Sequence, residues 1–598
     1  MAVRTIRKRE EIPAEYKWNL EDLFASDELW EQECEKLQQL CMQIKEFEGT
    51  LGQSAEQLYV FFQKADELAY YEGRICVYAN EKYHQDTTVA KYQGYASLSD
   101  SILAQAAQSI SFAEPEILQL SLEQIEQFYK EKPELESYRR CIEEMMRQKA
   151  HTRSAEVEEL LASVQEFAST PGTIFSMYNN ADIHIHSILD VEGNRIRITH
   201  GNFGLLLKSK DGRLRKNAFT SMYHAYEKMG NTIAAMFIAN LKQEAFFAKS
   251  RRYDSVRKMH MDAGNIPELV YDQLIETVHK YLPALHRYVS YRKKKMGVDR
   301  LHMYDLYLPL AEDPCITYPF EEAKDLVIRA LAPMGEEYVE ILKKGFSEGW
   351  IDVYENENKR SGAYSWAAYG THPYVLLNHQ DDLDSVFTIA HEMGHAMHTY
   401  YSNQTQPITY SDYRIFVAEV ASTCNESLLC QYMLEHAEDD RQKEYIMNHY
   451  LESFRTTLFR QAMFAEFEHI AHTKLAEGEA LTQEMLCDIY HDLNVAYYGP
   501  DIVVDEEIDY EWMRIPHFYT AYYVYQYATG YSAAIACADK IRKEGAPAAE
   551  AYIKNFLSGG SAKDPLDLLL GAGVDMSTPE PVEAALRVFE KCLDEFCS

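Results

Sequence analysis

The segment HEMGH at residues 391–395 contains residue types that can bind and use a metal ion. His391 and His395 are four positions apart, so on a helix their rings share one face and lie one turn from each other. Two imidazoles placed in this way can hold one zinc ion at about 2.1 Å from each nitrogen. Glu392 lies beside them and can accept a proton from a water molecule. The pattern predicts a catalytic metal site, against the alternative of a helix with idle histidines.

A catalytic zinc site needs a third protein ligand, and the sequence offers two candidates. His398 lies on the same helix as the pair, but three ligands spread over two turns would be nearly collinear and about 10 Å apart from end to end. Glu419 belongs to a second helical segment at residues 413–434 and could reach the metal from a neighbouring helix. Glu426, two turns further on, could orient a ligating histidine or be a surface carboxylate. Geometry favours Glu419 and leaves His398 open.

A second cluster of polar aromatic residues lies further along the chain, at residues 512–534. It contains His517 and six tyrosines: Tyr519, Tyr522, Tyr523, Tyr525, Tyr527 and Tyr531. Any single tyrosine at helical spacing is more typical of core packing. A histidine beside this many phenols indicates a set of neutral donors, which could stabilise the oxyanion that forms when a peptide bond is hydrolysed.

The elements that must position these residues are mostly helices. Helical periodicity predicts helices over residues 27–51, 54–83, 154–167, 321–331, 442–476 and 581–596. Two segments break the pattern. Residues 181–201 alternate around a Glu-Gly-Asn turn, which predicts a β-hairpin. Residues 360–380 predict one or two strands just before the HEMGH helix. We therefore expect a mainly α protein with a small β-sheet beside that helix.

Length and composition limit the class of protein. A chain of 598 residues is expected to form several lobes, and we place a division near residue 200. Residues 1–200 would form a helical N-terminal lobe ending in the hairpin, and residues 201–598 the catalytic domain. The formal charge of −35 argues against nucleic acid and anionic membranes as partners. Eleven scattered cysteines without a C-x-x-C pair, and no secretory signal, favour a cytoplasmic protein.

Three motifs together resemble a known family. HEMGHAMH, FVAEVASTCNE and IPHFYTAYYVYQYATG are similar, in this order, to the thimet-oligopeptidase-like zinc metallopeptidases. The similarity is closest to the oligoendopeptidase F branch. Further motifs of that branch, among them WNLEDLF, GAYSWAAYGTHPYVLLN and FLSGGSAKDPLDLLLGAGVD, extend the resemblance over nearly the whole chain.

The resemblance implies roles for individual residues. The family pattern makes His391, His395 and Glu419 the ligands of one Zn²⁺ per chain, with Glu392 as the general base. It also implies that His517 is an oxyanion donor, together with tyrosines from the segment that follows it.

The resemblance leaves the tyrosines ambiguous. The spacing after His517 in mammalian members selects Tyr522, with no tyrosine at the two later positions. Matching through the shared Y-x-x-Q-Y instead selects Tyr523 and Tyr527, which lie four apart on one helical face. We predict that Tyr523 and Tyr527 are the donors.

The family's fold is a two-lobed helical ellipsoid with a deep central substrate channel that admits flexible peptides and excludes folded proteins. The strand at residues 374–378 would be the edge strand that pairs with substrate, with Tyr374, Leu376 and Asn378 as substrate-binding residues. The predicted function is zinc-dependent hydrolysis of internal bonds in short oligopeptides. The alternatives are a zinc carboxypeptidase or dipeptidase of similar fold, and a non-catalytic peptide-binding protein.

Overall fold

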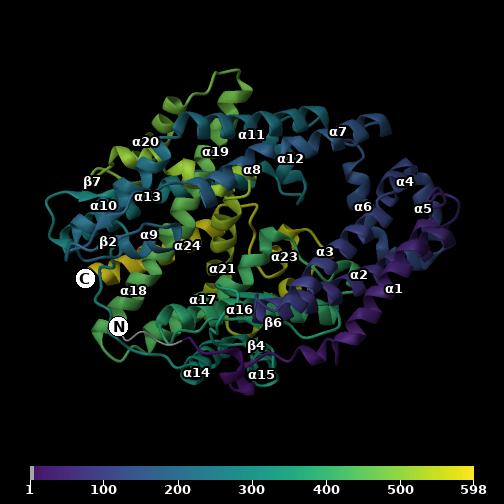
Figure 1. Cartoon of the computed structure of the whole chain (residues 1–598), viewed down its shortest axis with the longest axis horizontal. Helices are drawn as coiled ribbons and strands as arrows, with labels where there is room; N and C mark the ends of the chain where they lie inside the picture. Colours follow the sequence, from purple (N-terminus) through teal and green to yellow (C-terminus); the bar gives the residue numbers. More distant parts are fainter. Residues whose placement is uncertain (1–5) are drawn as a thin grey trace. The chain divides into compact units, whose positions relative to one another are not determined.

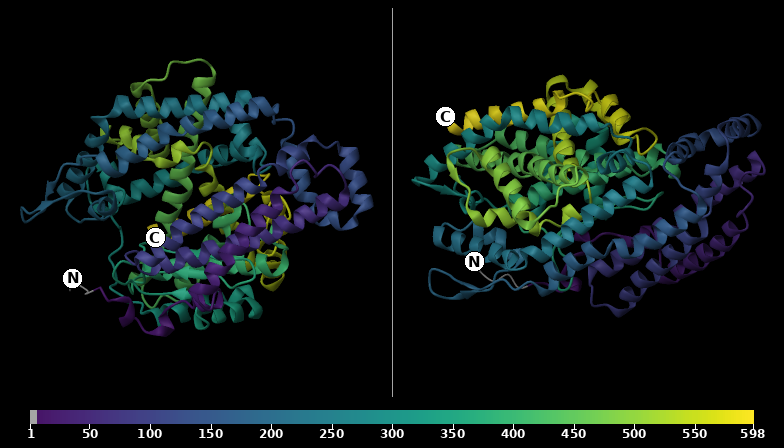
Figure 2. Two further views of the ribbon diagram at one scale, coloured as in Figure 1. Left: turned by 45° about the vertical axis from the view of Figure 1, so that its right-hand side comes forward. Right: turned by 90° about the horizontal axis from the view of Figure 1, so that it is seen from above.

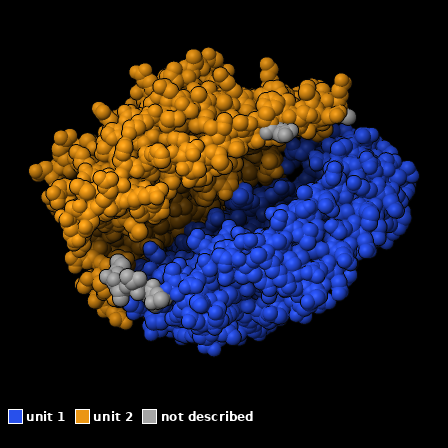
Figure 3. Space-filling model, in the orientation of Figure 1, with its two compact units in different colours: residues 1–150, 316–432, 537–573 blue, residues 151–315, 433–536, 574–598 orange. Residues whose placement is uncertain are grey.

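A computed structural model of the chain describes residues 6–598, most of which lie in helices. The chain forms two compact units, which Figure 3 shows in different colours. The first unit contains residues 1–150, 316–432 and 537–573, and the second contains residues 151–315, 433–536 and 574–598. Each unit thus gathers three separate stretches of sequence. The domain boundary near residue 200 stays a prediction.

The first unit contains the HEMGH segment. In chain order, its helices are α1 (Asp27–Lys45), α2 (Ala55–Gln85), α3 (Ala90–Ile110), α4 (Ala113–Gln119), α5 (Leu122–Glu131), α6 (Arg139–Gln148), α14 (Phe320–Ala330), α15 (Glu336–Ser347), α16 (Leu383–Thr405), α17 (Ile415–Glu435), α22 (Ala546–Ala551) and α23 (Pro565–Gly571). The last residues of α17 pass into the second unit.

Three long helices, α1, α2 and α3, pack against one another in the first unit, and Figures 1 and 2 show them running side by side. Their shared core includes the fully buried ring of Trp30, which is stacked on Tyr95 with 4.0 Å between ring centroids. Ser54 caps α2 by accepting a hydrogen bond from the third helical N–H. The helices predicted for residues 27–51 and 54–83 are confirmed.

A three-stranded sheet lies before α16 in the first unit. Its strands are β4 (Ile351–Asp352), β5 (Tyr364–Trp366) and β6 (Tyr374–Leu376), in the order β4-β6-β5. β6 is therefore the middle strand, parallel to β4 and antiparallel to β5. The prediction of one or two strands before the HEMGH helix is confirmed by β5 and β6, but the prediction that β6 is an edge strand is wrong. Its main chain is paired on both sides, because β4 occupies the side that was expected to be free.

The second unit is also mainly helical. In chain order, its helices are α7 (Ala155–Ala168), α8 (Thr170–Met177), α9 (His200–Leu207), α10 (Gly212–Glu227), α11 (Gly230–Ser250), α12 (Val256–Asp262), α13 (Glu268–Met296), α18 (Asp440–Phe454), α19 (Arg460–Ala476), α20 (Gln483–Tyr498), α21 (Tyr525–Glu544) and α24 (Glu580–Cys597). The C-terminal end of α21 passes into the first unit.

The strands of the second unit are short. β1 (Ile188–Leu189) and β2 (Arg195–Ile196) pair antiparallel, which confirms the hairpin predicted within residues 181–201. β3 (Leu301–His302) and β7 (Ile502–Val503) form a parallel pair. The mainly α fold with small sheets is thus confirmed. Over residues 6–598, none of the helices combines the length and the apolar character that crossing a membrane requires.

Candidate metal centre

α16 presents the two predicted histidines from one side of a buried helix. Asp382 caps its N-terminus by accepting a hydrogen bond from the N–H of Ser385 at 2.8 Å. Apolar residues fill its inner face, including Ile389, Ala390, Met393, Ala396 and Met397, all with no exposed surface. His391 and His395 are partly exposed on the other side, so packing of the apolar face fixes their direction.

The neighbouring helix α17 approaches α16 to backbone contact at Gly394. A Cβ atom at Gly394 would lie 2.6 Å from the Cα of Ser422 and 2.7 Å from the carbonyl oxygen of Ala421. Only glycine leaves room for this approach. The side-chain amide of Asn425 also donates a hydrogen bond to the carbonyl oxygen of Ala390 at 3.2 Å. These contacts fix the register of α17 on α16.

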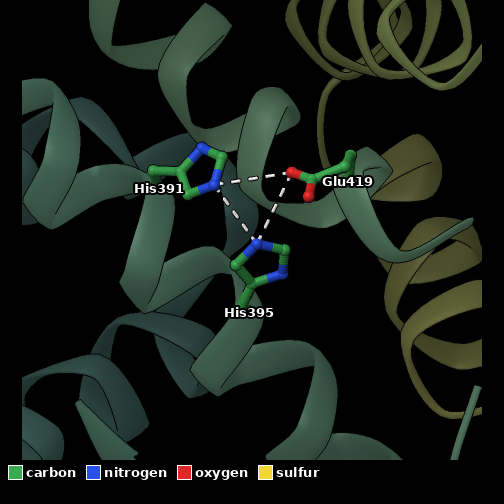
Figure 4. Close-up of side chains that lie close together, drawn as sticks. All are labelled: His391, His395 and Glu419. Carbon is green, nitrogen blue, oxygen red and sulfur yellow. Dashed lines mark hydrogen bonds and ion pairs between the residues drawn. The ribbon is translucent and has the colours of Figure 1, made fainter. Parts of the chain in front are cut away.

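This register brings Glu419 to the two histidines, as Figure 4 shows. The Nε2 atoms of His391 and His395 are 3.2 Å apart, and the Oε2 atom of Glu419 lies 3.4 Å and 3.6 Å from them, respectively. In a tetrahedral zinc site with bonds near 2.1 Å, ligand atoms are about 3.4 Å apart. The three residues therefore fit a single zinc-sized ion. We call His391, His395 and Glu419 the metal centre.

Two further side chains hold these ligands in place. The Nδ1 atom of His391 hydrogen-bonds to Oε1 of Glu426 at 2.5 Å, which turns Nε2 toward the other ligands. The hydroxyl of Ser422 donates a hydrogen bond to Oε2 of Glu419 at 3.1 Å. The orienting role predicted for Glu426 thus agrees with the observed contact, whereas no sequence pattern predicted the contact made by Ser422.

The metal centre favours cations. Burial lowers the pKa of His391, but the hydrogen bond to Glu426 and the surrounding carboxylates raise it to about 9. Burial raises the pKa of Glu419, whereas the hydrogen bond and charge of His395, with the charge of His391, lower it to about 2. Glu419 is therefore a carboxylate at neutral pH, and a metal ion would take the place of the proton on His391.

Glu392 has the properties of a base next to this centre. Its side chain is buried, and its Oε2 atom has no hydrogen-bond partner. Burial raises the pKa of Glu392 above the usual value for a glutamate. A carboxylate with a free oxygen and a raised pKa takes up a proton more readily than an exposed one.

His398, the alternative ligand, lies outside the metal centre. Its ring is fully buried and stacked on Tyr413, with 3.7 Å between centroids and 8° between planes. Burial lowers the pKa of His398 to about 3, so the ring is neutral. His391, His395 and Glu419 are the one group of three or more potential ligands found among the described residues, and His398 is absent from it.

The second unit brings together three other predicted residues, which we call the His517 cluster: His517, Tyr523 and Tyr527. The hydroxyl of Tyr527 lies 3.2 Å from Nε2 of His517. The rings of His517 and Tyr523 are parallel within 3°, with centroids 5.8 Å apart, and the Tyr523 and Tyr527 centroids are 5.4 Å apart. All three side chains are partly exposed.

Tyr522, which the other alignment selects, is oriented differently. Its side chain is 3% exposed and its hydroxyl lies 3.1 Å from Nδ1 of His469 on α19. Tyr523 and Tyr527, by contrast, are partly exposed. This arrangement favours the alignment that selects Tyr523 and Tyr527.

The predicted substrate-binding residues do not form an exposed row. Tyr374 and Leu376 are fully buried in the middle strand β6. The side-chain amide of Asn378 donates hydrogen bonds to the carbonyl oxygens of Arg360 and Gly362, at 3.0 Å and 2.8 Å. Asn378 therefore stabilises the segment before β5. Because β6 is paired on both sides, edge pairing with a peptide does not support a substrate-binding role for Tyr374, Leu376 or Asn378.

Comparisons with known proteins identify the family of the chain. The sequence matches the family described as Peptidase family M3 over residues 205–588, and Oligopeptidase F over residues 116–184. It is 47% identical to Oligopeptidase PepF of Bacillus subtilis (strain 168), over 98% of this chain and 88% of that protein.

Solved structures resemble the whole chain. A crystal structure of a protein from Chlamydophila abortus is 34% identical, with a TM-score of 0.92 over 99% of this chain and 100% of that chain. The structure of oligoendopeptidase-F from Enterococcus faecium is 38% identical, with a TM-score of 0.75 over 95% of this chain and 98% of that chain. These likenesses cover both units and the residues described above.

Replacing the third ligand tests the metal centre. Loss of a residue that only hydrogen-bonds to a metal ligand lowers metal affinity by roughly 10- to 100-fold. We expect Glu419→Ala to lower zinc affinity by more than this, because it removes a ligand itself. His398→Phe, which keeps a ring against Tyr413 but removes both nitrogens, should bind zinc like the parent. The measurement is competition for zinc with a chromophoric chelator. Parental affinity in the Glu419 variant, with loss in the His398 variant, would move the site to His398.

Replacing Gly394 tests the helix contact. Gly394→Ala would press a methyl group into the backbone of α17, and we expect it to lower the free energy of unfolding by about 1–3 kcal/mol. Zinc affinity should fall as well, because Glu419 is carried on α17. Gly94→Ala is the matched control, since a Cβ atom at Gly94 in α3 would meet nothing within 4 Å. Thermal unfolding and chelator competition report both effects, and parental zinc affinity in Gly394→Ala would contradict the assignment.

Proposed function

Because the chain belongs to peptidase family M3 and is therefore a metallopeptidase, we propose that it is a zinc-dependent endopeptidase acting on internal bonds of short oligopeptides. The observation that carries this proposal is the metal centre itself: three ligand atoms 3.2–3.6 Å apart, with Glu392 on the same helix. The relative named Oligopeptidase PepF, 47% identical, supports the substrate class.

The donor set supports zinc as the metal. Two imidazole nitrogens and one carboxylate oxygen are the ligands that catalytic zinc sites use, and such sites leave the fourth position open. Calcium and magnesium prefer oxygen ligands alone, and magnesium also demands octahedral geometry. His391, His395 and Glu419 would hold one zinc ion per chain. When bound there, zinc supplies a Lewis acid that polarises the scissile carbonyl and acidifies the attacking water.

Glu392 carries the proton in the proposed reaction. Its unpartnered Oε2 accepts the proton that the attacking water loses. The same carboxyl then delivers this proton to the nitrogen of the leaving amine, so the group returns to its starting state. The raised pKa of Glu392 suits both transfers, because it brings the pKa closer to neutral pH.

The His517 cluster supplies the neutral donors of the proposal. Burial lowers the pKa of His517, which leaves its imidazole uncharged at neutral pH. An uncharged imidazole and two phenols can donate hydrogen bonds to a developing oxyanion without charge of their own. The ring contacts among His517, Tyr523 and Tyr527 support a shared role. That this cluster acts on the same peptide as the metal centre rests on the family resemblance.

The substrate's main chain needs a partner other than β6. The sheet order leaves β5 (Tyr364–Trp366) at an edge, and a peptide strand adding to that edge would form main-chain hydrogen bonds. We propose β5 for this role. The limit to short peptides, a deep channel and a cytoplasmic location rest on the resemblance and the sequence, and they stay predictions.

Replacing the base tests the chemistry. Glu392→Gln keeps the shape of the side chain but cannot accept the proton, so we expect kcat to fall by about 10²- to 10⁴-fold. Zinc content should remain at one ion per chain, since Glu392 is not a ligand. Hydrolysis of a quenched fluorescent peptide and metal analysis of the same preparation measure both. A variant that cleaves the peptide near the parental rate would show that the assigned base is wrong.

Blocked peptides test the endopeptidase assignment against a carboxypeptidase or dipeptidase. We expect hydrolysis of peptides that carry both an N-terminal acetyl group and a C-terminal amide, because cleavage of an internal bond needs neither free end. The same peptides with free ends are the controls. Mass spectrometry of the products identifies the bond that is cut. If only peptides with a free carboxyl terminus are cleaved, the protein is a carboxypeptidase.

A further inference from the structure

The chain between His517 and the other two members of the His517 cluster contains a strained residue. Tyr522 has a backbone φ of +52°, the left-handed region that bulky side chains rarely adopt. Such a conformation persists only where the surroundings impose it, and it is common near functional sites. Tyr522 lies immediately before Tyr523, so its backbone sets the direction in which the Tyr523 side chain leaves the main chain.

The side chain of Tyr522 is held by α19. Its hydroxyl lies 3.1 Å from Nδ1 of His469, and its ring centroid lies 5.1 Å from that of His472. On the side of α13, the ring of Tyr271 packs against it at 5.8 Å. With 3% of its surface exposed, Tyr522 has no freedom to change its rotamer without opening this pocket.

The backbone of Tyr522 is held by the same helix. Its N–H donates a hydrogen bond to Oε1 of Glu468 at 2.8 Å. Glu468 is 1% exposed, and its other oxygen has no partner. A buried carboxyl group that accepts one backbone N–H is unusual, because burial without full pairing is costly. Glu468 and His469 together thus hold both the backbone and the hydroxyl of one strained residue.

The consequence appears in the direction of the next side chain. Tyr522 points into the pocket on α19, whereas Tyr523 points to His517, with rings parallel within 3°. Tyr527, in the first turn of α21 and four residues after Tyr523, lies with its hydroxyl 3.2 Å from Nε2 of His517. A relaxed backbone at Tyr522 would change the path of the chain between His517 and Tyr523 and separate these rings.

We propose that Tyr522, clamped by Glu468 and His469, is a positioning residue that sets the His517 cluster in the geometry needed to donate to the oxyanion. The inference rests on the proposed function, since the role of the His517 cluster is part of it. Tyr522 itself is not a catalytic residue, because its hydroxyl bonds to His469.

The first test replaces Tyr522 itself and so removes its contacts with His469 and His472. Glycine adopts positive and negative φ with similar ease and has no side chain. Tyr522→Gly therefore removes the contacts of the ring with α19 and lets the backbone at residue 522 take other conformations. We expect kcat to fall about tenfold. This loss is smaller than the roughly 10²- to 10³-fold loss that removal of an oxyanion donor causes, because the donors are displaced but still present. KM should stay within about threefold, since the affected interactions belong to the transition state. Zinc content, set in the first unit, should not change.

A double-mutant cycle separates positioning from mere loss of stability. In a background of Tyr523→Phe and Tyr527→Phe, we expect Tyr522→Gly to lower kcat by a much smaller factor than in the parent, because two of the three donors that it positions have lost their hydroxyls. An equal loss in both backgrounds would overturn the proposal, and so would parental kcat for Tyr522→Gly alone. If the two-Phe background itself keeps parental kcat, the donor role in the proposed function is wrong, and the positioning role falls with it.

The second test acts through Glu468 and does not depend on Tyr522→Gly folding. Burial raises the pKa of Glu468 to about 8, so the carboxyl is protonated at pH 7. Glu468→Gln, which keeps a carbonyl oxygen for the N–H of Tyr522, should then retain parental kcat at pH 7. Glu468→Leu removes the acceptor at similar volume and should lower kcat as Tyr522→Gly does. Parental kcat in Glu468→Leu, or equal losses in both variants, would overturn the clamp.

Discussion

The metal centre depends on two helices that touch backbone to backbone. α16 alone carries two nitrogens on one face, which hold an ion on one side only. The third ligand arrives because α17 packs against Gly394, where any side chain would meet the Cα atom of Ser422. The bond from Asn425 to the carbonyl oxygen of Ala390 then fixes the register. The position of Glu419, one turn before Ser422, thus depends on the close approach that Gly394 allows and on the hydrogen bond of Asn425.

The parts of the site that the sequence predicted are those governed by local periodicity. Four-residue spacing on a helix determines that His391 and His395 share a face, whatever surrounds the helix. Tyr523 and Tyr527 were expected to share a helical face as well, but Tyr523 lies before α21 (Tyr525–Glu544), so that prediction is wrong. Contacts with His517 bring their rings together instead. Periodicity alone could not predict Glu419 as a ligand, because it lies on another helix and the contact between two helices is a tertiary property. The family resemblance was needed for that prediction. The helices themselves were predictable because their apolar faces repeat over many turns.

The parts that escaped prediction depend on contacts between distant segments. β4 is two residues long, too short for an alternating pattern, yet it pairs with β6 and turns an expected edge strand into a central one. The role of Gly394 is of the same kind, because the sequence does not reveal which segment approaches a glycine in a helix. The left-handed backbone of Tyr522 carried no sign either, since tyrosine is not a residue that usually marks such a turn.

The interleaved order of the two units has a consequence for how the protein is made. The first unit needs residues 537–573 and the second needs residues 574–598, so neither unit is complete until residues beyond 536 have been synthesised. Helices α1, α2 and α3 can pack early, but the first unit closes only after residues 537–573 are made, and the second only after residues 574–598. Until those residues are made, the apolar surface that they cover in the folded units has no partner on the nascent chain, and such surface is what chaperones bind.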